Sequence, residues 1–219
     1  MHLHSYRLQN FRRLRSVLVE LAPDISIFVG ANNSGKTSAT QALQMFLSGD
    51  HKRFSLFDFS SHAWKELNAL GEADAANDLD ATLPYISLDL WFGVAASDLY
   101  LVVPILPSSQ GVGTEVGLRI EFAATNGQTV LQRFREKKKE GQDRVAKLAG
   151  GAGSYVPWPK CLTDYLEKEL HREFEFRYFV LDRAQFSTDY APQDGYQPEP
   201  LVPDHSAAAL LKALSTVDN

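Results

Sequence analysis

The chain has 219 residues, with 22 Lys and Arg against 27 Asp and Glu, so its formal net charge is -5. Hydrophobic residues make up 44% and charged residues 22%, which is typical of a folded globular protein and excludes a disordered one. No stretch has the roughly 18 consecutive apolar residues of a membrane span, and the N-terminal segment lacks the apolar core of a signal peptide. The single cysteine excludes a disulfide framework, and the negative charge gives no reason to expect general nucleic-acid binding. We therefore expect a cytoplasmic α/β protein without membrane contact.

The N-terminal residues predict three strands before the first helix. Residues 3–12 and 14–21 read as two strands that pair with each other, and apolar residues alternate along the second. Residues 25–29, Ile-Ser-Ile-Phe-Val, are apolar except for Ser26, which predicts a short buried strand.

This third strand leads directly into a phosphate-binding motif. The segment Gly30-Ala-Asn-Asn-Ser-Gly35-Lys36-Thr37 matches G-x-x-x-x-G-K-[ST] at every fixed position. After it, apolar residues at 39, 42, 43, 46 and 47 have the spacing of a core-facing helix, and Ser48-Gly49 predicts where that helix ends. Strand, loop and helix follow one another in the order that a P-loop requires.

The chemistry of a P-loop assigns a role to each of these residues. Backbone N–H groups of the loop point inward and cradle a polyphosphate, and the helix N-terminus adds its partial positive charge. Lys36 is expected to bridge the β- and γ-phosphates, and the Thr37 hydroxyl is expected to ligate Mg²⁺. We therefore expect ATP and Mg²⁺ as cofactors. The expected nucleotide-binding residues are Gly30, Asn32, Asn33, Ser34, Gly35, Lys36, Thr37 and Ser38, with Arg12 as a further contact.

The residues in and before the loop resemble those of a known group of ATPases. Asn10-Phe11-Arg12 in the first strand and the loop itself resemble the ABC-type ATPase heads of the RecF/SMC group. Within that group, Asn32-Asn33-Ser34 is most similar to the OLD (overcoming lysogenization defect) family, which are ATP-dependent nucleases with a C-terminal Toprim domain. The close resemblance covers about the first 50 residues. It implies an α/β fold, namely a P-loop ABC-type ATPase lobe with a mixed sheet and an accompanying antiparallel β-hairpin region.

The middle of the chain predicts an insert followed by antiparallel strands over residues 81–136. Residues 49–80 indicate a helix-bearing insert and a loop, and residues 85–92 alternate as a strand. Asn126-Gly127 lies between residues 115–124 and 128–136 and predicts a hairpin. The basic run Arg135-Glu-Lys-Lys-Lys139 then leads toward a Gly-rich segment, where a solvated loop is expected and DNA contact is the alternative.

The later residues predict a helix and a strand over residues 160–183. Leu162, Tyr165, Leu166 and Leu170 have helical spacing, and residues 174–181 read as a strand. Asp182 follows this strand and is a candidate Walker B ligand of Mg²⁺, but Arg183 stands where ABC ATPases place their catalytic Glu. Under the resemblance, a strand ending in Arg precedes a helical insertion, and Leu181-Asp182-Arg183 fits that pattern. Residues 192–219 predict a loop and the start of a helical segment.

The function that these features predict is that of an ATPase lobe. Residues 1–50 supply the strands, P-loop and first helix, but no signature motif, Walker B carboxylate pair or switch His is recognisable. We therefore interpret residues 1–219 as the N-terminal part of an ABC-type head and leave its catalytic residues unassigned. The resemblance implies that two heads form a homodimer or higher homo-oligomer on ATP and regulate DNA cleavage by a Toprim domain outside this chain. It also implies DNA contact through the full protein, and a partner protein of a defence system.

Two alternatives remain open on the sequence. The first is a DNA-repair ATPase of the RecF/SMC type without nuclease activity. The second is a self-contained P-loop small-molecule kinase that uses Asp182 as its Mg²⁺ carboxylate.

Overall fold

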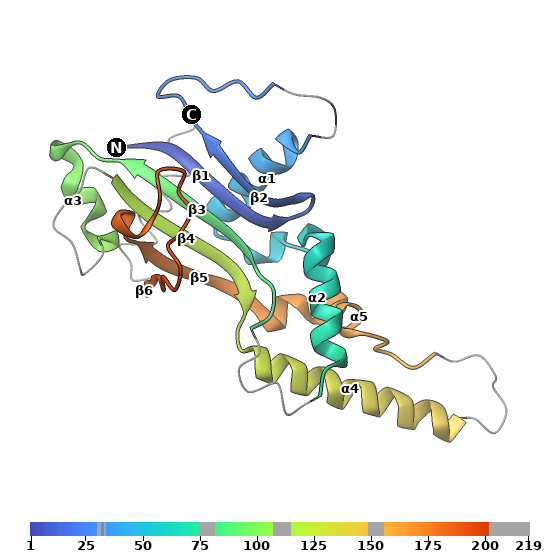
Figure 1. Ribbon diagram of the computed structural model, residues 1–219. Coiled ribbons are helices and arrows are strands. Elements are labelled where there is room, and N and C mark those ends of the chain that lie inside the picture. The colour runs from blue at the N-terminus through green and yellow to red at the C-terminus, as the bar shows by residue number, and fades with distance from the viewer. Residues whose placement is uncertain (30–31, 33, 75–81, 107–114, 149–155, 202–219) are drawn as a thin grey trace.

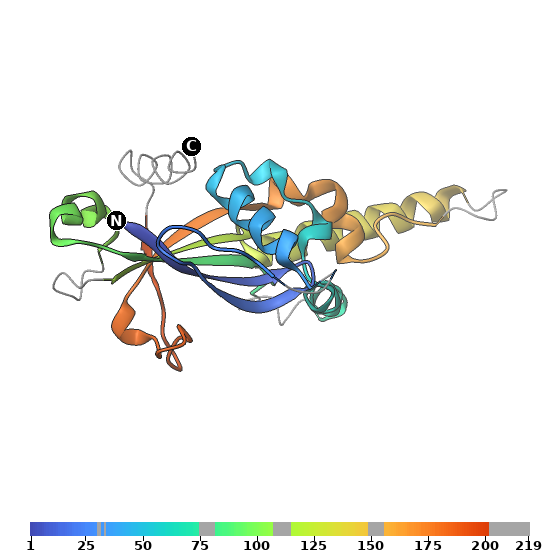
Figure 2. The same ribbon diagram turned by 90° about the horizontal axis from the view of Figure 1, so that it is seen from above.

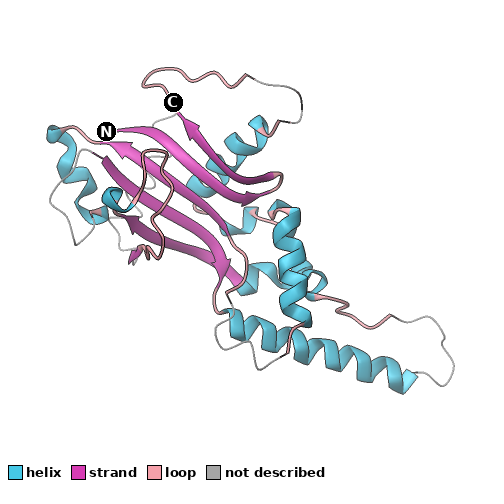
Figure 3. Ribbon diagram, viewed as in Figure 1, coloured by secondary structure: helices cyan, strands magenta, loops and turns pink. Residues whose placement is uncertain are grey.

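A single six-stranded sheet organises the molecule (Figures 1 and 3). The computed structural model describes residues 1–29, 32, 34–74, 82–106, 115–148 and 156–201. Within these residues the strand order is β2-β1-β3-β4-β5-β6, and every pairing is antiparallel. The strands are β1 (His2–Phe11), β2 (Leu14–Glu20), β3 (Ile86–Gly93), β4 (Glu115–Ala124), β5 (Phe174–Leu181) and β6 (Glu199–Leu201). The antiparallel part of the expected fold is confirmed, whereas the described strands form no parallel pair and so do not make the sheet mixed.

Helices lie on one face of this sheet and at both of its ends, with α3 at the end opposite α2, α4 and α5. Figure 2 shows α1 above the sheet, and Figure 1 shows α2, α4 and α5 gathered at the end from which α4 projects. The helix predicted from the spacing of four apolar residues is confirmed as α5, where all four are buried: Leu162, Tyr165, Leu166 and Leu170. The helices are α1 (Lys36–Leu47), α2 (Ser61–Glu72), α3 (Leu99–Val102), α4 (Gly127–Leu148) and α5 (Leu162–Glu173). Short 3₁₀ turns are η1 (His51–Arg53), η2 (Leu56–Asp58), η4 (Ala96–Asp98), η5 (Val103–Ile105) and η6 (Arg183–Gln185).

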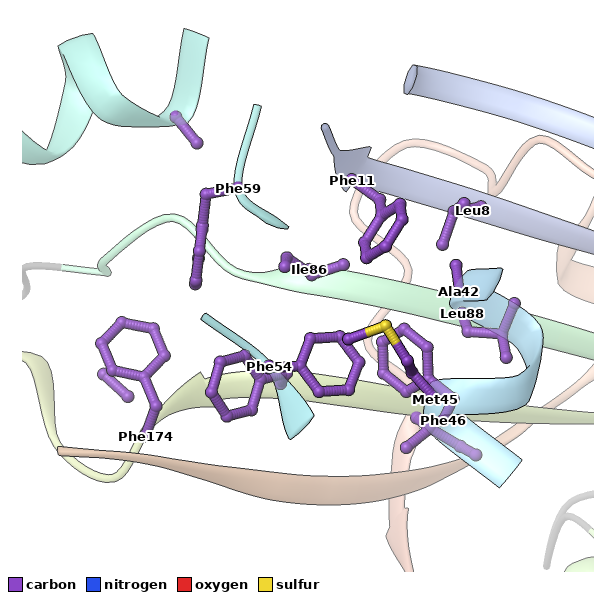
Figure 4. Close-up of a cluster of buried hydrophobic side chains, with 14 of the residues drawn as sticks. Leu8, Phe11, Ala42, Met45, Phe46, Phe54, Phe59, Ile86, Leu88 and Phe174 are labelled. Atoms are coloured by element: carbon purple, nitrogen blue, oxygen red, sulfur yellow. The ribbon is translucent and has the colours of Figure 1, made fainter. Parts of the chain in front are cut away.

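Aromatic side chains fill the space between α1 and the sheet (Figure 4). Phe54 is central to this layer: its ring stacks on Phe122 with centroids 4.8 Å apart and meets Phe46 edge-on at 4.9 Å. The predicted apolar face of β3 is confirmed, since its even-numbered residues are buried against the helices. Burying several Phe rings contributes roughly 2–3 kcal/mol each, so this layer is the main source of stability.

The predicted hairpin at Asn126-Gly127 is wrong. Residues from Gly127 onward form the 22-residue helix α4, and only β4 on the N-terminal side is a strand. The Asn126 side chain accepts a hydrogen bond from the Thr129 amide at 2.8 Å, so Asn126 acts as a helix N-cap rather than as a turn residue. Val130, Leu131 and Phe134 are fully buried, which is helical rather than strand spacing.

The basic run after this cap is therefore helical and partly neutralised. Arg135–Lys139 lie within α4 rather than in the solvated loop that the sequence predicted. Lys138 forms an ion pair with Glu72 of α2 at 2.7 Å, and Lys137 pairs with Glu140 at 2.9 Å. Acidic partners thus lie beside two of the three lysines.

The predicted buried strand over residues 25–29 is also not observed. The segment has no regular secondary structure, and its apolar side chains are exposed: Ile25 by 77%, Ile27 by 81% and Val29 by 89%. A strand is stabilised by pairing and by burial of its side chains, and no strand among the described residues pairs with this segment. The segment is therefore apolar, as the sequence shows, but the described part of the molecule leaves its side chains exposed.

The C-terminal part of the described chain covers the second face of the sheet. The predicted loop beginning at residue 192 contains β6, and residues 202–219, including the predicted helical segment, lie outside the described residues. Figure 2 shows the stretch between β5 and β6 on the side of the sheet opposite α1. Phe186 and Tyr190 of this stretch form a small apolar cluster with Trp91 and Leu181 of the sheet.

Buried charges accompany this cluster. Arg119 on β4 donates from Nε and Nη2 to the two carboxylate oxygens of Asp89, at 2.6 and 2.8 Å. The two residues are direct cross-strand partners on β3 and β4. Burial disfavours the charged guanidinium, but the hydrogen bonds and charge of Asp89 outweigh burial and raise the pKa of Arg119. Asp89 is thus one half of a buried ion pair.

His4 is expected to make stability depend on pH. Its Nε2 atom is buried without a hydrogen-bond partner in the described structure and lies 3.6 Å from Glu115 Oε1. Burial lowers the pKa of His4 below 6.5, although Glu115 acts in the opposite direction. A lowered histidine pKa means that the unfolded chain binds the proton more readily, so the stabilising contribution is lost as pH falls below about 6.5.

The measurement is the thermal midpoint as a function of pH. Between pH 8 and pH 5.5, His4→Asn is expected to flatten the decline seen in the native chain, whereas His62→Asn, which changes an exposed histidine, leaves it unchanged. Equal slopes for the native chain and His4→Asn would contradict this assignment.

Candidate phosphate-binding site

A polar hollow lies at the N-terminus of α1. Its volume is about 370 Å³, and the described residues that line it include three cationic side chains and no carboxylate. The lining residues are Arg12, Arg13, Asn32, Ser34, Gly35, Lys36, Thr37 and Ser38. The β1–β2 turn and the P-loop are thus brought together, although Arg13 and Asn32 are 19 positions apart in sequence.

Gly35 determines how closely the β1–β2 hairpin approaches the loop. It has φ of +95°, in the left-handed region that favours glycine. A Cβ at this position would lie 2.6 Å from Leu14 Cδ2, at the start of β2. The absence of a side chain therefore allows the hairpin to pack directly on the start of α1.

The start of α1 is well suited to an anion. Gly35 is the N-cap and provides no side-chain cap, and the first turn contains no acidic residue. The first amides of a helix have no partner within the helix, and the helix dipole places partial positive charge there. Lys36 Nζ donates to Ser34 Oγ at 3.2 Å, which holds the ammonium at the mouth of the hollow, and the Thr37 side chain is exposed beside it. These groups match the electrostatics of a phosphate chain.

Arg12 is fixed beside the loop by contacts from three directions. Its Nε donates to Asp58 Oδ1 at 2.9 Å, and its Nη1 donates to Gln41 on α1. Its guanidinium also lies 4.9 Å from the centre of the Phe11 ring. Asp58 is in turn held by the amide and hydroxyl of Ser55, each at 2.9 Å. The turn is therefore braced against both η2 and α1.

The sequence-derived site residues come together in large part. Among the expected residues, Arg12, Asn32, Ser34 and positions 35–38 line the one hollow, whereas Gly30 and Asn33 lie outside the described residues. Arg13 also lines it and was not predicted, although its place directly after Asn10-Phe11-Arg12 was a usable signal.

Asp182 lies elsewhere. It follows β5, and its Oδ1 accepts a hydrogen bond from the Ala184 amide at 2.9 Å, which caps the turn η6. It is not among the residues that line the hollow. In the described part of the chain, no group of three or more His, Cys, Asp and Glu side chains is placed to hold a metal ion. The kinase alternative, which assigned Asp182 to Mg²⁺, therefore receives no support from this geometry.

Known proteins resemble the chain in sequence. A family model described as AAA ATPase domain matches residues 1–177. The DNA replication and repair protein RecF of Heliobacterium modesticaldum is 33% identical over 78 residues, covering 34% of this chain and 21% of that protein. RecF of Listeria welshimeri is 37% identical over 60 residues, covering 27% and 16%. The chain thus spans about a fifth or less of the length of these curated relatives.

Two further proteins also resemble the chain. An uncharacterized protein of Methanocaldococcus jannaschii is 39% identical over 66 residues, covering 26% of this chain and 30% of that protein. A solved structure from work on the ATP-driven dimerization and DNA-stimulated activation of SMC ATPases has a TM-score of 0.35 and 17% identity, covering 56% of this chain and 64% of that one.

Family and fold agree with the site. No helix in the described part of the chain is long and apolar enough to cross a lipid bilayer. The α/β architecture, with its antiparallel sheet beside a P-loop helix, fits a P-loop ATPase lobe. Since the family model covers most of its 219 residues, the chain belongs to the AAA ATPase domain family.

Proposed function

We propose that this chain is the nucleotide-binding lobe of an OLD-like ATPase and that it binds Mg-ATP at the N-terminus of α1. The observation that supports this most directly is the hollow lined by the P-loop and the β1–β2 turn, with three cations and no carboxylate. The phosphate chain of ATP carries three to four negative charges, so it needs such a lining. In this proposal, ATP draws two heads together and thereby regulates DNA cleavage by a Toprim domain.

The residues present fit magnesium as well as phosphate. The Thr37 hydroxyl lies at the mouth of the hollow, and hydroxyl and phosphate oxygens are ligands that Mg²⁺ accepts while keeping several waters. Magnesium, when bound with the nucleotide, would neutralise charge on the β- and γ-phosphates. Lys36 would hold the same phosphates from the other side, and the amides at the start of α1 would orient them.

The exposed segment 25–29 bears on the architecture of the active ATPase. It leads into the P-loop, and its apolar side chains are uncovered in the described structure. We propose that this segment becomes a strand when further strands of the ATPase head lie beside it. The chain would then be the N-terminal part of an ABC-type head, with its Walker B and signature residues contributed from outside the described residues.

Magnesium dependence offers a direct test of the proposed site. Thr37→Val keeps the shape of the side chain and removes the hydroxyl, so it is expected to weaken ATP binding in the presence of Mg²⁺ by about tenfold, because one inner ligand is lost. Without Mg²⁺, binding to this variant and to the native chain is expected to be equal. The measurement is calorimetric titration with ATP, with and without magnesium.

The matched control is Thr40→Val on the same helix. The Thr40 hydroxyl donates to the Thr37 carbonyl at 3.1 Å and does not line the hollow. This variant should bind Mg-ATP like the native chain. An equal loss in both threonine variants, or none in Thr37→Val, would count against the assigned magnesium position.

A second function is favoured by the sequence similarity to RecF. Proteins of that name act in DNA replication and repair, and the alignments include relatives from two bacterial genera. On this alternative, the chain would belong to a repair ATPase without nuclease activity. A DNA-cleavage assay on the full protein with ATP and Mg²⁺ separates the two: cleavage supports the OLD-like proposal, and ATP hydrolysis without cleavage supports the repair ATPase.

A further inference from the structure

Two consecutive arginines occupy the β1–β2 turn, and their surroundings differ sharply. Both side chains line the hollow at the P-loop. Arg12 has φ of +52°, which turns the chain so that neighbouring side chains point in different directions. Leu14 then packs on Gly35, which places the whole turn against the start of α1.

Arg12 is committed to holding this turn in place. Its backbone amide donates to the Asp58 carbonyl at 2.7 Å, and its Nε donates to the Asp58 carboxylate. The Asp58 side chain is only 5% exposed, so its charge depends on Arg12 for compensation. The Gln41 side-chain oxygen accepts a hydrogen bond from a second nitrogen of the same guanidinium. Much of the hydrogen-bonding capacity of Arg12 is therefore used within the protein.

Arg13 is in the opposite situation. It is exposed, it lines the hollow, and within the described residues it makes no hydrogen bond, ion pair or ring contact. A guanidinium has five N–H donors in a planar fork that matches two phosphate oxygens at once. Arg13 is thus a cation at the rim of the candidate phosphate-binding hollow, and no described residue engages its side-chain donors.

We infer that Arg13 is a phosphate-binding residue of this site, contacting the phosphate chain of the nucleotide, while Arg12 braces the turn that presents it. The inference rests on the proposed function, because it names a ligand contact of the same site. It adds an exposed cation from the β1–β2 turn to Lys36 at the start of α1.

The test compares Arg13→Gln with Arg15→Gln, an equal change of charge two residues away on exposed β2 that does not line the hollow. The ligands are ATP and inorganic tripolyphosphate, each titrated calorimetrically into the full 219-residue chain. Arg13→Gln is expected to weaken both by about tenfold, since one charge-assisted contact is lost. Arg15→Gln should change neither by more than about twofold, and Arg13→Lys should recover part of the loss.

Thermal midpoints without ligand separate binding from folding. Arg13→Gln should leave the midpoint unchanged, whereas Arg12→Gln should lower it by several degrees because Asp58 loses its partner. A lowered midpoint for Arg13→Gln, or a loss for ATP but not for tripolyphosphate, would overturn the inference. If Lys36→Ala abolishes binding and Arg13→Gln binds normally, the inference fails while the proposed function stands. If Lys36→Ala binds normally, the proposed function itself fails.

Discussion

Replacing Lys36 with alanine is expected to reduce Mg-ATP affinity at least about 100-fold, which corresponds to roughly 2.7 kcal/mol. The ammonium group lies at the mouth of the hollow, held near Ser34, and α1 contributes no second cation in its first turn. The remaining positive charge comes from the β1–β2 turn and from the helix dipole, and the dipole is worth only about 1 kcal/mol. Without the lysine, the turn and the dipole still attract the phosphate chain at long range, but the helix no longer offers it a charged hydrogen-bond donor. Calorimetric titration and nucleotide-dependent thermal stabilisation both measure this loss.

Lys139→Ala provides the matched control, because Lys139 is an exposed lysine on α4 far along the chain from the hollow. Its affinity for Mg-ATP should equal that of the native chain. Lys36 lies in the half-buried first turn of α1, so Lys36→Met, which keeps the aliphatic stem, distinguishes loss of charge from loss of packing. Both Lys36 variants should bind equally poorly and unfold at the native midpoint. Unchanged nucleotide affinity in either would refute the proposed site.

The P-loop could be predicted because its chemistry is local. Gly35, Lys36 and Thr37 lie within three consecutive positions, and the helix after them shows its buried face through residue spacing alone. The sequence also predicted β1, β2, β3 and α5, each of which has a clear period of apolar residues. Where the residues that determine an element lie within one segment, the sequence was sufficient to predict that element.

Segments whose structure depends on distant partners were predicted less well. Asn126-Gly127 is a strong turn signal, but an Asn that accepts from the amide three residues later also starts a helix, and the spacing of Val130, Leu131 and Phe134 decides in favour of the helix. Residues 25–29 have the composition of a buried strand, yet burial needs neighbouring strands that the described residues do not include. The apolar composition of a segment therefore predicts that it needs to be buried, but it does not predict whether neighbouring strands are present to bury it.

The turn residues of the site illustrate the same limit. That Arg12 is tied to Asp58 and Gln41, while Arg13 is left at the rim, depends on contacts between segments 29 to 46 residues apart. The pairing of Asp89 with Arg119 likewise depends on the register of β3 against β4. No spacing rule in a single sequence fixes either, so these assignments required the tertiary structure.

The buried ion pair leads to the largest expected effect on stability. Arg119→Met is expected to cost about 3–5 kcal/mol in the free energy of unfolding, because it leaves the Asp89 carboxylate, only 1% exposed, without its guanidinium. For a domain of this size that corresponds to a fall of about 10 °C in the thermal midpoint. Chemical denaturation at pH 7 measures the free energy, and Asp89→Leu should be nearly as harmful, since Arg119 then retains only Glu121 at 3.9 Å.

The double variant Asp89→Leu with Arg119→Met tests whether this loss of stability comes from an uncompensated buried charge. If the penalty comes from an uncompensated buried charge, removing both charges should restore at least half of the lost stability, and the double-mutant cycle should show strong coupling. Arg172→Met is the matched control: it removes an arginine that is 62% exposed and paired with Glu169 at 3.7 Å, and it should cost less than about 1 kcal/mol. A double variant as unstable as the sum of the single ones would mean that the two charges are not coupled, and it would refute the explanation by an uncompensated buried charge.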